Sequence, residues 1–205
     1  MKIRFAYVVI FLFVATLLAA AGTTTASSST LENLQAAYNG ESNAHARYLA
    51  FATKADAEGY VQVASLFRAA ARAEEIHAVN HAVVIKKMGD TPTAKIEKPT
   101  VKTTKENLAA AIQGETYERD TMYPEFLKEA RAKRNTDAIQ TFSYAKSAEA
   151  EHARLYADAL KDLEQMRVKG VTYYVCTVCG FTTTKLDFNK CPSCFNSKDK
   201  YVVVS

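Results

Sequence analysis

The feature that most constrains the fold of this chain is a motif that occurs twice. Glu74-x-x-His77 and Glu149-x-x-His152 each lie in a segment rich in Ala, Glu and Arg. Residues three positions apart share one face of an α-helix, so each motif places a carboxylate beside an imidazole. One such pair is typical of a solvated helix face, but two pairs in matching segments indicate two ligand-bearing helices.

The motifs are part of a longer internal repeat. A Gly-Glu dipeptide precedes each motif, ending at Glu41 and at Glu115. The copies are separated by 74 residues from Glu41 to Glu115 and by 75 residues from Glu74 to Glu149. These similar offsets predict one helical hairpin used twice, with the two halves related by a pseudo-twofold axis.

Breaks in composition divide the chain. A polar spacer at 22–29, a proline-bearing segment at 89–104 and a change to cysteine-rich sequence at 168–172 bound the helical regions. Gly59 predicts a turn between helices near 30–58 and 60–88. Residues 133–137 predict a second turn, between the third and fourth helices. Thr103 with Glu106 predicts the capping box that starts the third helix. Two short turns and one long crossover predict an all-α, ferritin-like four-helix bundle over 30–167.

The predicted helices carry a set of metal ligands. Single carboxylates from two helices, with Glu-x-x-His from the other two, form the ligand pattern of ferritin-like di-iron bundles. Carboxylates neutralise two multivalent cations in a dry core and can bridge them, and imidazole binds iron well. The candidate di-iron ligands are Glu41, Glu74, His77, Glu115, Glu118, Glu149 and His152.

All four cysteines lie after residue 175, as Cys176-x-x-Cys179 and Cys191-x-x-Cys194. Paired motifs at this spacing predict a tetrahedral four-thiolate metal site. The module at 172–205 is too short for a folded core of its own, so metal binding would supply the missing folding free energy. Iron and zinc both fit four thiolates, and two disulfides are the alternative in an exported protein.

These stretches resemble one family. "GESNAHARY", "EEIHA", "GETYERDTMYP" and "EAEHARLY", followed by "CTVCG" and "CPSC", are similar to the motifs of rubrerythrins, from Leu31 to the C-terminus. The resemblance implies a non-haem di-iron peroxidase that reduces hydrogen peroxide to water. It also implies that 172–205 is a rubredoxin-like domain whose single iron relays electrons, and that the protein is a homodimer in which this domain approaches the partner's di-iron site.

The resemblance also implies roles for individual residues. His77 would exchange with Glu118 at one iron when the oxidation state changes, while Tyr48 and Tyr123 would hydrogen-bond ligand carboxylates. These four are the candidate catalytic residues. The repeat is imperfect here, because Tyr48 follows its glutamate by seven residues and Tyr123 by eight.

The N-terminus predicts export. Residues 1–21 have a basic start, an apolar run and small residues at the end, the pattern of a signal peptide. We therefore expect a periplasmic protein whose electron donor is an exported redox protein, or a membrane-anchored one if the segment is not cleaved. The near-balanced charge of the remainder gives no argument for nucleic acid.

Other interpretations remain. A ferritin-type ferroxidase with a structural zinc ribbon is the main alternative, and a zinc-stapled metal-sensing module without turnover is another. His45 and His81 are expected to be half-buried or exposed, and Glu75 and Glu151 to point away from the metal face. Phe195 stands where rubredoxin-like motifs usually have Gly, and we expect it to weaken a backbone N–H contact to sulfur.

Overall fold

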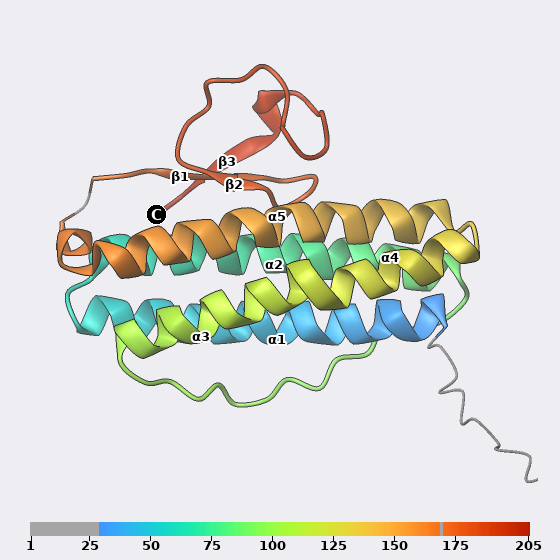
Figure 1. Cartoon of the computed structure of the whole chain (residues 1–205), viewed down its shortest axis with the longest axis horizontal. Coiled ribbons are helices and arrows are strands. Elements are labelled where there is room, and N and C mark those ends of the chain that lie inside the picture. The colour runs from blue at the N-terminus through green and yellow to red at the C-terminus, as the bar shows by residue number, and fades with distance from the viewer. Residues whose placement is uncertain (1–28, 169) are drawn as a thin grey trace, which may run out of the picture.

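The computed structural model describes residues 29–168 and 170–205. The predicted signal segment at 1–21 and the spacer up to residue 28 lie outside the described residues. The helices are α1 (Thr30–Ala57), α2 (Val61–Lys87), α3 (Thr104–Tyr117), α4 (Tyr123–Ala132) and α5 (Thr136–Lys161). They form the predicted four-helix bundle, with α3 and α4 together as the third helix (Figure 1).

Local signals explain where the helices start and stop. Ser29 forms a capping box at the start of α1, and Thr103 forms the predicted one with Glu106 at the start of α3. Gly59 takes a left-handed φ of 78° in the turn between α1 and α2, a conformation that glycine adopts without strain. The side chain of Asn135 accepts the Ala138 N–H at the start of α5.

The third helix differs from expectation, because a π-helix at Glu118–Met122 separates α3 from α4. A π-turn accommodates one extra residue, which would otherwise rotate the following side chains off their face. This insertion explains why Tyr123 follows Glu115 by eight residues although Tyr48 follows Glu41 by seven. Both tyrosines are fully buried.

The crossover between α2 and α3 is held along α1 by amide side chains. Asn43 donates to the Lys95 carbonyl at 3.0 Å and accepts the Glu97 N–H at 2.8 Å, and Asn39 accepts the Lys95 N–H at 2.8 Å. Gln35 accepts the Thr93 N–H at 3.2 Å. These contacts satisfy the backbone of a segment that has no regular structure of its own.

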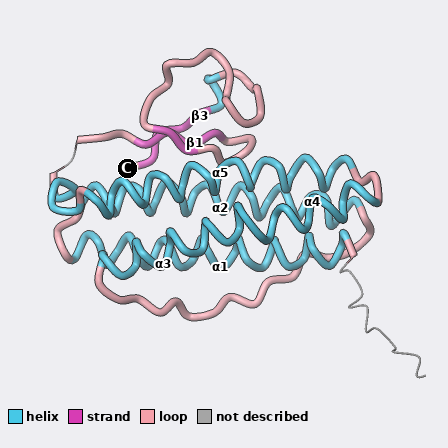
Figure 2. Tube along the Cα trace, viewed as in Figure 1, coloured by secondary structure: helices cyan, strands magenta, loops and turns pink. Residues whose placement is uncertain are grey.

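The C-terminal module is a small antiparallel sheet of β1 (Tyr173–Cys176), β2 (Thr182–Thr183) and β3 (Tyr201–Val204), in the order β2-β1-β3. It lies across α2 and α5, on the side of the bundle away from the crossover (Figures 1 and 2). Among the described residues, none of the helices has the length and apolar character needed to cross a membrane. The predicted combination of a ferritin-like bundle and a rubredoxin-like module is confirmed.

Candidate metal centres

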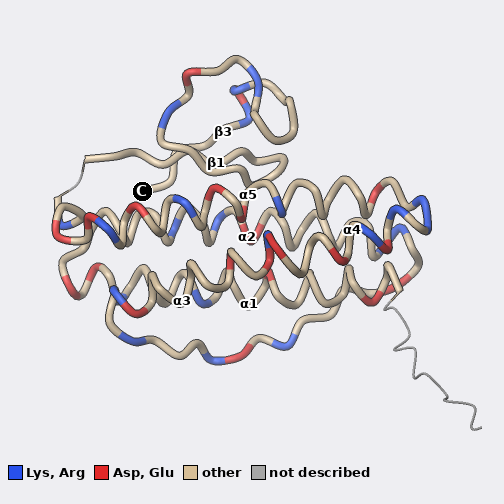
Figure 3. The backbone as a smooth tube through the Cα atoms, viewed as in Figure 1, with Lys and Arg blue, Asp and Glu red and all other residues tan. Residues whose placement is uncertain are grey.

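Six of the seven predicted di-iron ligands converge inside the bundle. They form two groups, each with ligand atoms within 4.8 Å of one another: Glu41, Glu74, His77 and Glu149 in the first, and Glu74, Glu115, Glu149 and His152 in the second. The ligands come from α1, α2, α3 and α5, and acidic segments of these helices occur near the middle of the bundle (Figure 3). Each ligand side chain is 0–1% exposed.

The two groups share their central carboxylates. His77 Nδ1 lies 2.9 Å from Glu74 Oε2, 3.1 Å from Glu149 Oε1 and 3.8 Å from Glu41 Oε2. His152 Nδ1 lies 2.9 Å from Glu149 Oε2 and 3.4 Å from Glu74 Oε1. Glu74 and Glu149 therefore turn one oxygen toward each imidazole, which is the arrangement needed to bridge two metal ions.

The terminal carboxylates complete the pseudo-twofold pattern. Glu41 belongs only to the group of His77, whereas Glu115 belongs only to the group of His152, at 3.8 Å from its Nδ1. The Tyr48 hydroxyl donates to Glu115 Oε1, and the Tyr123 hydroxyl donates to Glu41 Oε1. Each tyrosine thus fixes the terminal carboxylate of the other half of the repeat and leaves the second oxygen of that carboxylate for a metal.

Unpaired atoms test whether this pocket fits two irons. Several of its fully buried ligand atoms make no hydrogen bond: Glu41 Oε2, Glu74 Oε1, Glu115 Oε2, both Glu149 oxygens and His152 Nδ1. Buried polar atoms without partners are costly, and here they all face the same two positions. Oxygen and imidazole ligands of this kind suit iron, so the donor set fits a pair of iron ions.

Electrostatics support the same conclusion. Burial, reinforced by the charge of Glu74, raises the pKa of Glu149 to about 8. Burial also raises the pKa of Glu74, with the charges of Glu115 and Glu41 adding to the effect. Four carboxylates this close are mutually repulsive, and bound cations would offset that repulsion.

Glu118 is the predicted ligand that belongs to neither group. It is half-buried and begins the π-helix. Burial, with the charges of Glu41 and Glu115, raises the pKa of its carboxyl well above the ordinary value, so it lies near the pocket. It also lines a cleft of about 380 Å³ between α1 and the crossover, together with Arg47 and Asn43. In this arrangement the first group contains His77 as a ligand and does not contain Glu118.

Three further acidic and histidine residues near the ligand motifs lie outside both ligand groups. Glu75 is exposed and pairs with Arg72 at 2.5 Å, and Glu151 pairs with Arg154 at 2.5 Å, so both point away from the metals as predicted. His45 is half-buried, with Nδ1 at 2.7 Å from the Ala71 carbonyl.

The expectation for His81 was wrong, because its side chain is 0% exposed. Its Nε2 lies 3.2 Å from the Tyr123 hydroxyl and its Nδ1 lies 2.9 Å from the Thr141 hydroxyl. His81 therefore supports the tyrosine that holds Glu41. Its position four residues after His77 was a sequence signal for this role, since both lie on the same helix face.

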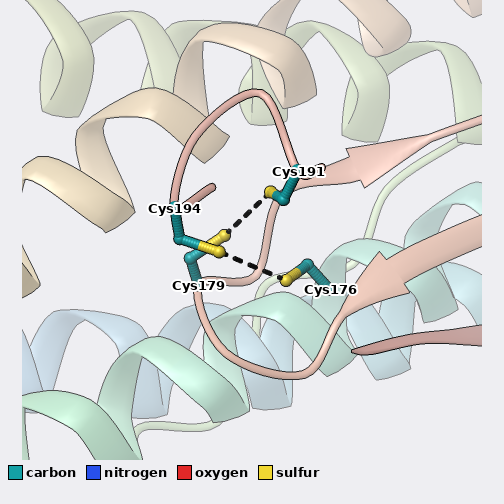
Figure 4. A group of neighbouring side chains, drawn as sticks. All are labelled: Cys176, Cys179, Cys191 and Cys194. Carbon is teal, nitrogen blue, oxygen red and sulfur yellow. Dashed lines mark hydrogen bonds between the residues drawn. The ribbon is translucent and has the colours of Figure 1, made fainter. Parts of the chain in front are cut away.

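The four cysteines form a second cluster, with all sulfurs within 4.8 Å of one another. Cys176 Sγ lies 3.7 Å from Cys194 Sγ, and Cys179 Sγ lies 3.6 Å from Cys191 Sγ (Figure 4). These distances exclude disulfides, whose S–S bond is about 2 Å. They are close to the edge of about 3.8 Å of a tetrahedron with metal–sulfur bonds of about 2.3 Å.

Phe195 stands beside this cluster at the position where glycine is usual. It takes a left-handed φ of 60°, like Gly180 at 76° in the first cysteine motif. The backbone thus adopts the glycine conformation despite the side chain, and the Asn196 side-chain amide donates to Cys194 Sγ at 3.4 Å. The expected weakening of the backbone N–H contact to sulfur stays a prediction.

The two centres are joined by hydrogen bonds within one chain. His77 Nε2 lies 3.0 Å from the Cys179 carbonyl, and His152 Nε2 lies 3.0 Å from the Thr182 hydroxyl. A carbonyl only accepts, so the His77 Nε2 carries the hydrogen, and the ring would bind a metal in the pocket through the lone pair of a deprotonated Nδ1. The module of this chain therefore contacts its own bundle at His77, and the contact between subunits that the resemblance implied stays a prediction. Sequence reasoning missed Thr182, for which no local pattern gave a signal.

Comparisons with known proteins agree with this geometry. A model of the rubrerythrin family matches residues 32–160. Nigerythrin from Nitratidesulfovibrio vulgaris is 39% identical over 178 residues, covering 86% of this chain and 87% of that protein. Rubrerythrin-2 from Clostridium acetobutylicum is 37% identical over 179 residues, covering 85% of this chain and 96% of that protein.

A solved structure of nigerythrin in its fully reduced, all-ferrous state has a TM-score of 0.81 to this structure at 38% identity. It covers 90% of this chain and 91% of that one. The similarity therefore extends over both the bundle and the cysteine module. The Glu/His groups and the four-cysteine cluster match the iron centres of nigerythrin, and the two predicted metal sites are confirmed.

Proposed function

This chain belongs to the rubrerythrin family, and on that premise we propose that it is a peroxidase that reduces hydrogen peroxide to water. The observation that carries the proposal is the pair of ligand groups that share Glu74 and Glu149. His77, a member of the first group, is also hydrogen-bonded to the cysteine module. Iron in the shared pocket would supply two electrons to each peroxide, and iron held by the cysteines would return them singly.

The chain's own residues prepare the pocket for this reaction. Tyr48 and Tyr123 hold Glu115 and Glu41 in one orientation, so that only one oxygen of each carboxylate remains to bind metal. Glu118 lines the cleft beside the pocket, where its carboxyl can pass a proton to or from a bound substrate oxygen. Hydrogen peroxide is small enough to fit in this cleft beside Glu118.

A peroxide titration tests the proposal. The iron-loaded protein is reduced without oxygen, hydrogen peroxide is added, and the visible absorption of the thiolate-bound iron is followed. We expect that absorption to return as peroxide is consumed, at one peroxide for each two electrons. Metal analysis distinguishes the alternatives, since two irons and one zinc in each chain, with no return of absorption, would support the ferroxidase with a zinc ribbon.

We also propose that the protein is exported, that it receives electrons from an exported redox protein, and that it is a homodimer. The first two proposals are supported by the sequence of residues 1–21. N-terminal sequencing of the native protein and cell fractionation test export, and a cytosolic protein starting at Met1 would contradict it. Light scattering on the purified protein tests the dimer.

A further inference from the structure

The two cysteine motifs of the module face different surroundings. Gly180 follows Cys179 and lies against His77, so closely that a Cβ there would be 2.3 Å from the ring nitrogen Nε2. On the other motif, Cys194 is the least buried of the four cysteines, and the next residue, Phe195, is 70% exposed. One motif therefore faces the di-iron pocket and the other faces outward.

Phe195 combines strain with exposure. A left-handed φ is unfavourable for a non-glycine residue, and in the described part of the chain Arg134 is the only other non-glycine residue with positive φ. Glycine would fill this position without strain, and a buried aromatic ring would offset the cost by packing. An exposed phenylalanine in a strained conformation, beside a metal ligand, indicates a surface kept for contact with another molecule.

The module that carries Phe195 has an excess of basic residues. Residues 172–205 contain four lysines and two aspartates, one of which, Asp199, is exposed between Lys198 and Lys200. Lys190 pairs with Ser197 in a β-bridge, the Lys198 N–H donates to the Asn189 carbonyl, and the Lys200 carbonyl accepts a backbone N–H. All three side chains are exposed, and none forms an ion pair with another described residue. Figure 3 shows several basic segments, along with acidic ones, on the loops of this module.

We propose that Phe195, Lys190, Lys198 and Lys200, here called the knuckle face, bind an acidic electron-carrier protein. The proposal rests on the proposed function. It is an exchange of one electron with no bond made or broken: the carrier is oxidised, and the iron held by the cysteines is reduced from ferric to ferrous. The electron enters beside Cys194 and leaves by the opposite motif, through the Cys179 carbonyl and His77.

The chemistry of the face favours this partner. An exposed aromatic ring inside a polar, charged rim is the usual composition of a transient protein interface. Exposed lysines without ion-pair partners in the same module attract an acidic surface and accelerate encounter at low salt. A second copy of this chain is the competing occupant of the face, and the experiments below distinguish it by the oligomeric state of the variants.

Binding is measured with two probes of opposite charge, an acidic rubredoxin and a basic cytochrome c, using calorimetry and the iron-loaded full chain. We expect the acidic probe to bind and the basic one not to. Phe195→Gly should weaken binding about tenfold, as for one aromatic anchor, and without loss of thermal stability because glycine suits the backbone. Val203→Thr, which alters another exposed apolar residue of the module, is the matched control.

Charge is tested separately. Lys190→Glu with Lys198→Glu should slow reduction of the protein by the acidic probe about tenfold at low salt, and the difference should shrink as salt is raised. Lys102→Glu with Lys105→Glu makes the same change of net charge on the bundle, at exposed positions, and should leave that rate near the original.

The results separate this proposal from the proposed function. Oxidation of the chemically reduced variants by peroxide does not involve the carrier protein. If peroxide fails to oxidise them, the result counts against the proposed peroxidase activity alone, and the binding constants still test whether the knuckle face binds the carrier. Unchanged binding in both knuckle-face variants, or tighter binding of the basic probe, would overturn the inference. So would a change of oligomeric state in Phe195→Gly, which would assign the face to a second copy.

Discussion

His77 donates a hydrogen bond from Nε2 to the backbone carbonyl of Cys179, at 3.0 Å, while its Nδ1 faces the carboxylates of the di-iron pocket. One imidazole therefore contacts both metal centres. This relationship depends on the close approach of the cysteine module to α2, which leads to the first prediction.

Replacing Gly180 by alanine should detach the module from the bundle. The new Cβ would lie 2.3 Å from His77 Nε2, in addition to the strain of a left-handed φ of 76°. Gly89→Ala is the matched control, since φ is 85° there and no atom lies within 4 Å of the new Cβ. Both should lose about 1 kcal/mol from strain, and only Gly180→Ala should also show faster hydrogen exchange in β1. Equal effects would contradict the predicted contact.

Removing one tyrosine hydroxyl should destabilise the pocket. Tyr48→Phe leaves Glu115 Oε1 without its donor, so we expect a loss of about 1–3 kcal/mol in unfolding free energy and slower reaction with peroxide. Tyr156→Phe is the control, because Tyr156 is equally buried, packs against Tyr48, and has a hydroxyl without a partner. Chemical denaturation measures both, and an equal loss in the two variants would contradict the assigned role.

Thr182→Val should weaken metal binding at a distance from the ligands. The Thr182 hydroxyl lies 3.0 Å from His152 Nε2 and fixes the ring. Loss of such a supporting contact typically lowers metal affinity about 10- to 100-fold. Thr183→Val, on the same strand but without this contact, is the control. Iron retention during competition with a chelator measures the effect, and identical retention would show that Thr182 does not orient the ligand.

Removing the metals should make stability depend strongly on pH. The pKa of Glu149 is raised from 4.5 to about 8 by burial. Although burial alone lowers the pKa of His77 and His152, the neighbouring carboxylates raise both. These three groups let the folded apoprotein bind more protons than the unfolded chain, so the stability that they contribute is fully present near pH 4.5 and is lost as pH rises toward about 8. The lowered pKa values of Glu41 and His81 act in the opposite direction, in more acidic solution.

Metal-loaded protein should not show this loss, because its ligands are already deprotonated. The difference in melting temperature between loaded and chelated protein should therefore widen over the same pH range. Parallel melting curves across that range would contradict the convergence of these groups in one pocket.

Acid sensitivity should have a separate origin at Glu58. Its carboxylate accepts the Thr104 N–H at 2.8 Å, at the start of α3, and pairs with Lys54 at 3.0 Å. The hydrogen bonds from Thr104 lower its pKa from 4.5 to about 2, so the stability it contributes is present above pH 4.5 and is lost as pH falls toward 2. Glu58→Gln should lose about 1 kcal/mol at neutral pH and less in acid, whereas Glu75→Gln should change little.

The sequence alone determined the ligand types and the helices that carry them. Glu-x-x-His at i and i+3 and Cys-x-x-Cys are local patterns, whose geometry follows from a single helical turn or loop. The capping box at Thr103 is equally local, which is why the start of the third helix could be predicted closely.

Features of the site that depend on contacts between distant segments of the chain were decided only by the tertiary structure. It showed that Glu74 and Glu149 are shared, that Glu118 lies outside both groups, and that His81 is buried against Tyr123. It also placed the cysteine module on its own bundle, with Cys179 at His77. Sequence spacing fixes a side chain's direction on its own helix, whereas its neighbours depend on how the helices pack and where the crossover and linker return the chain.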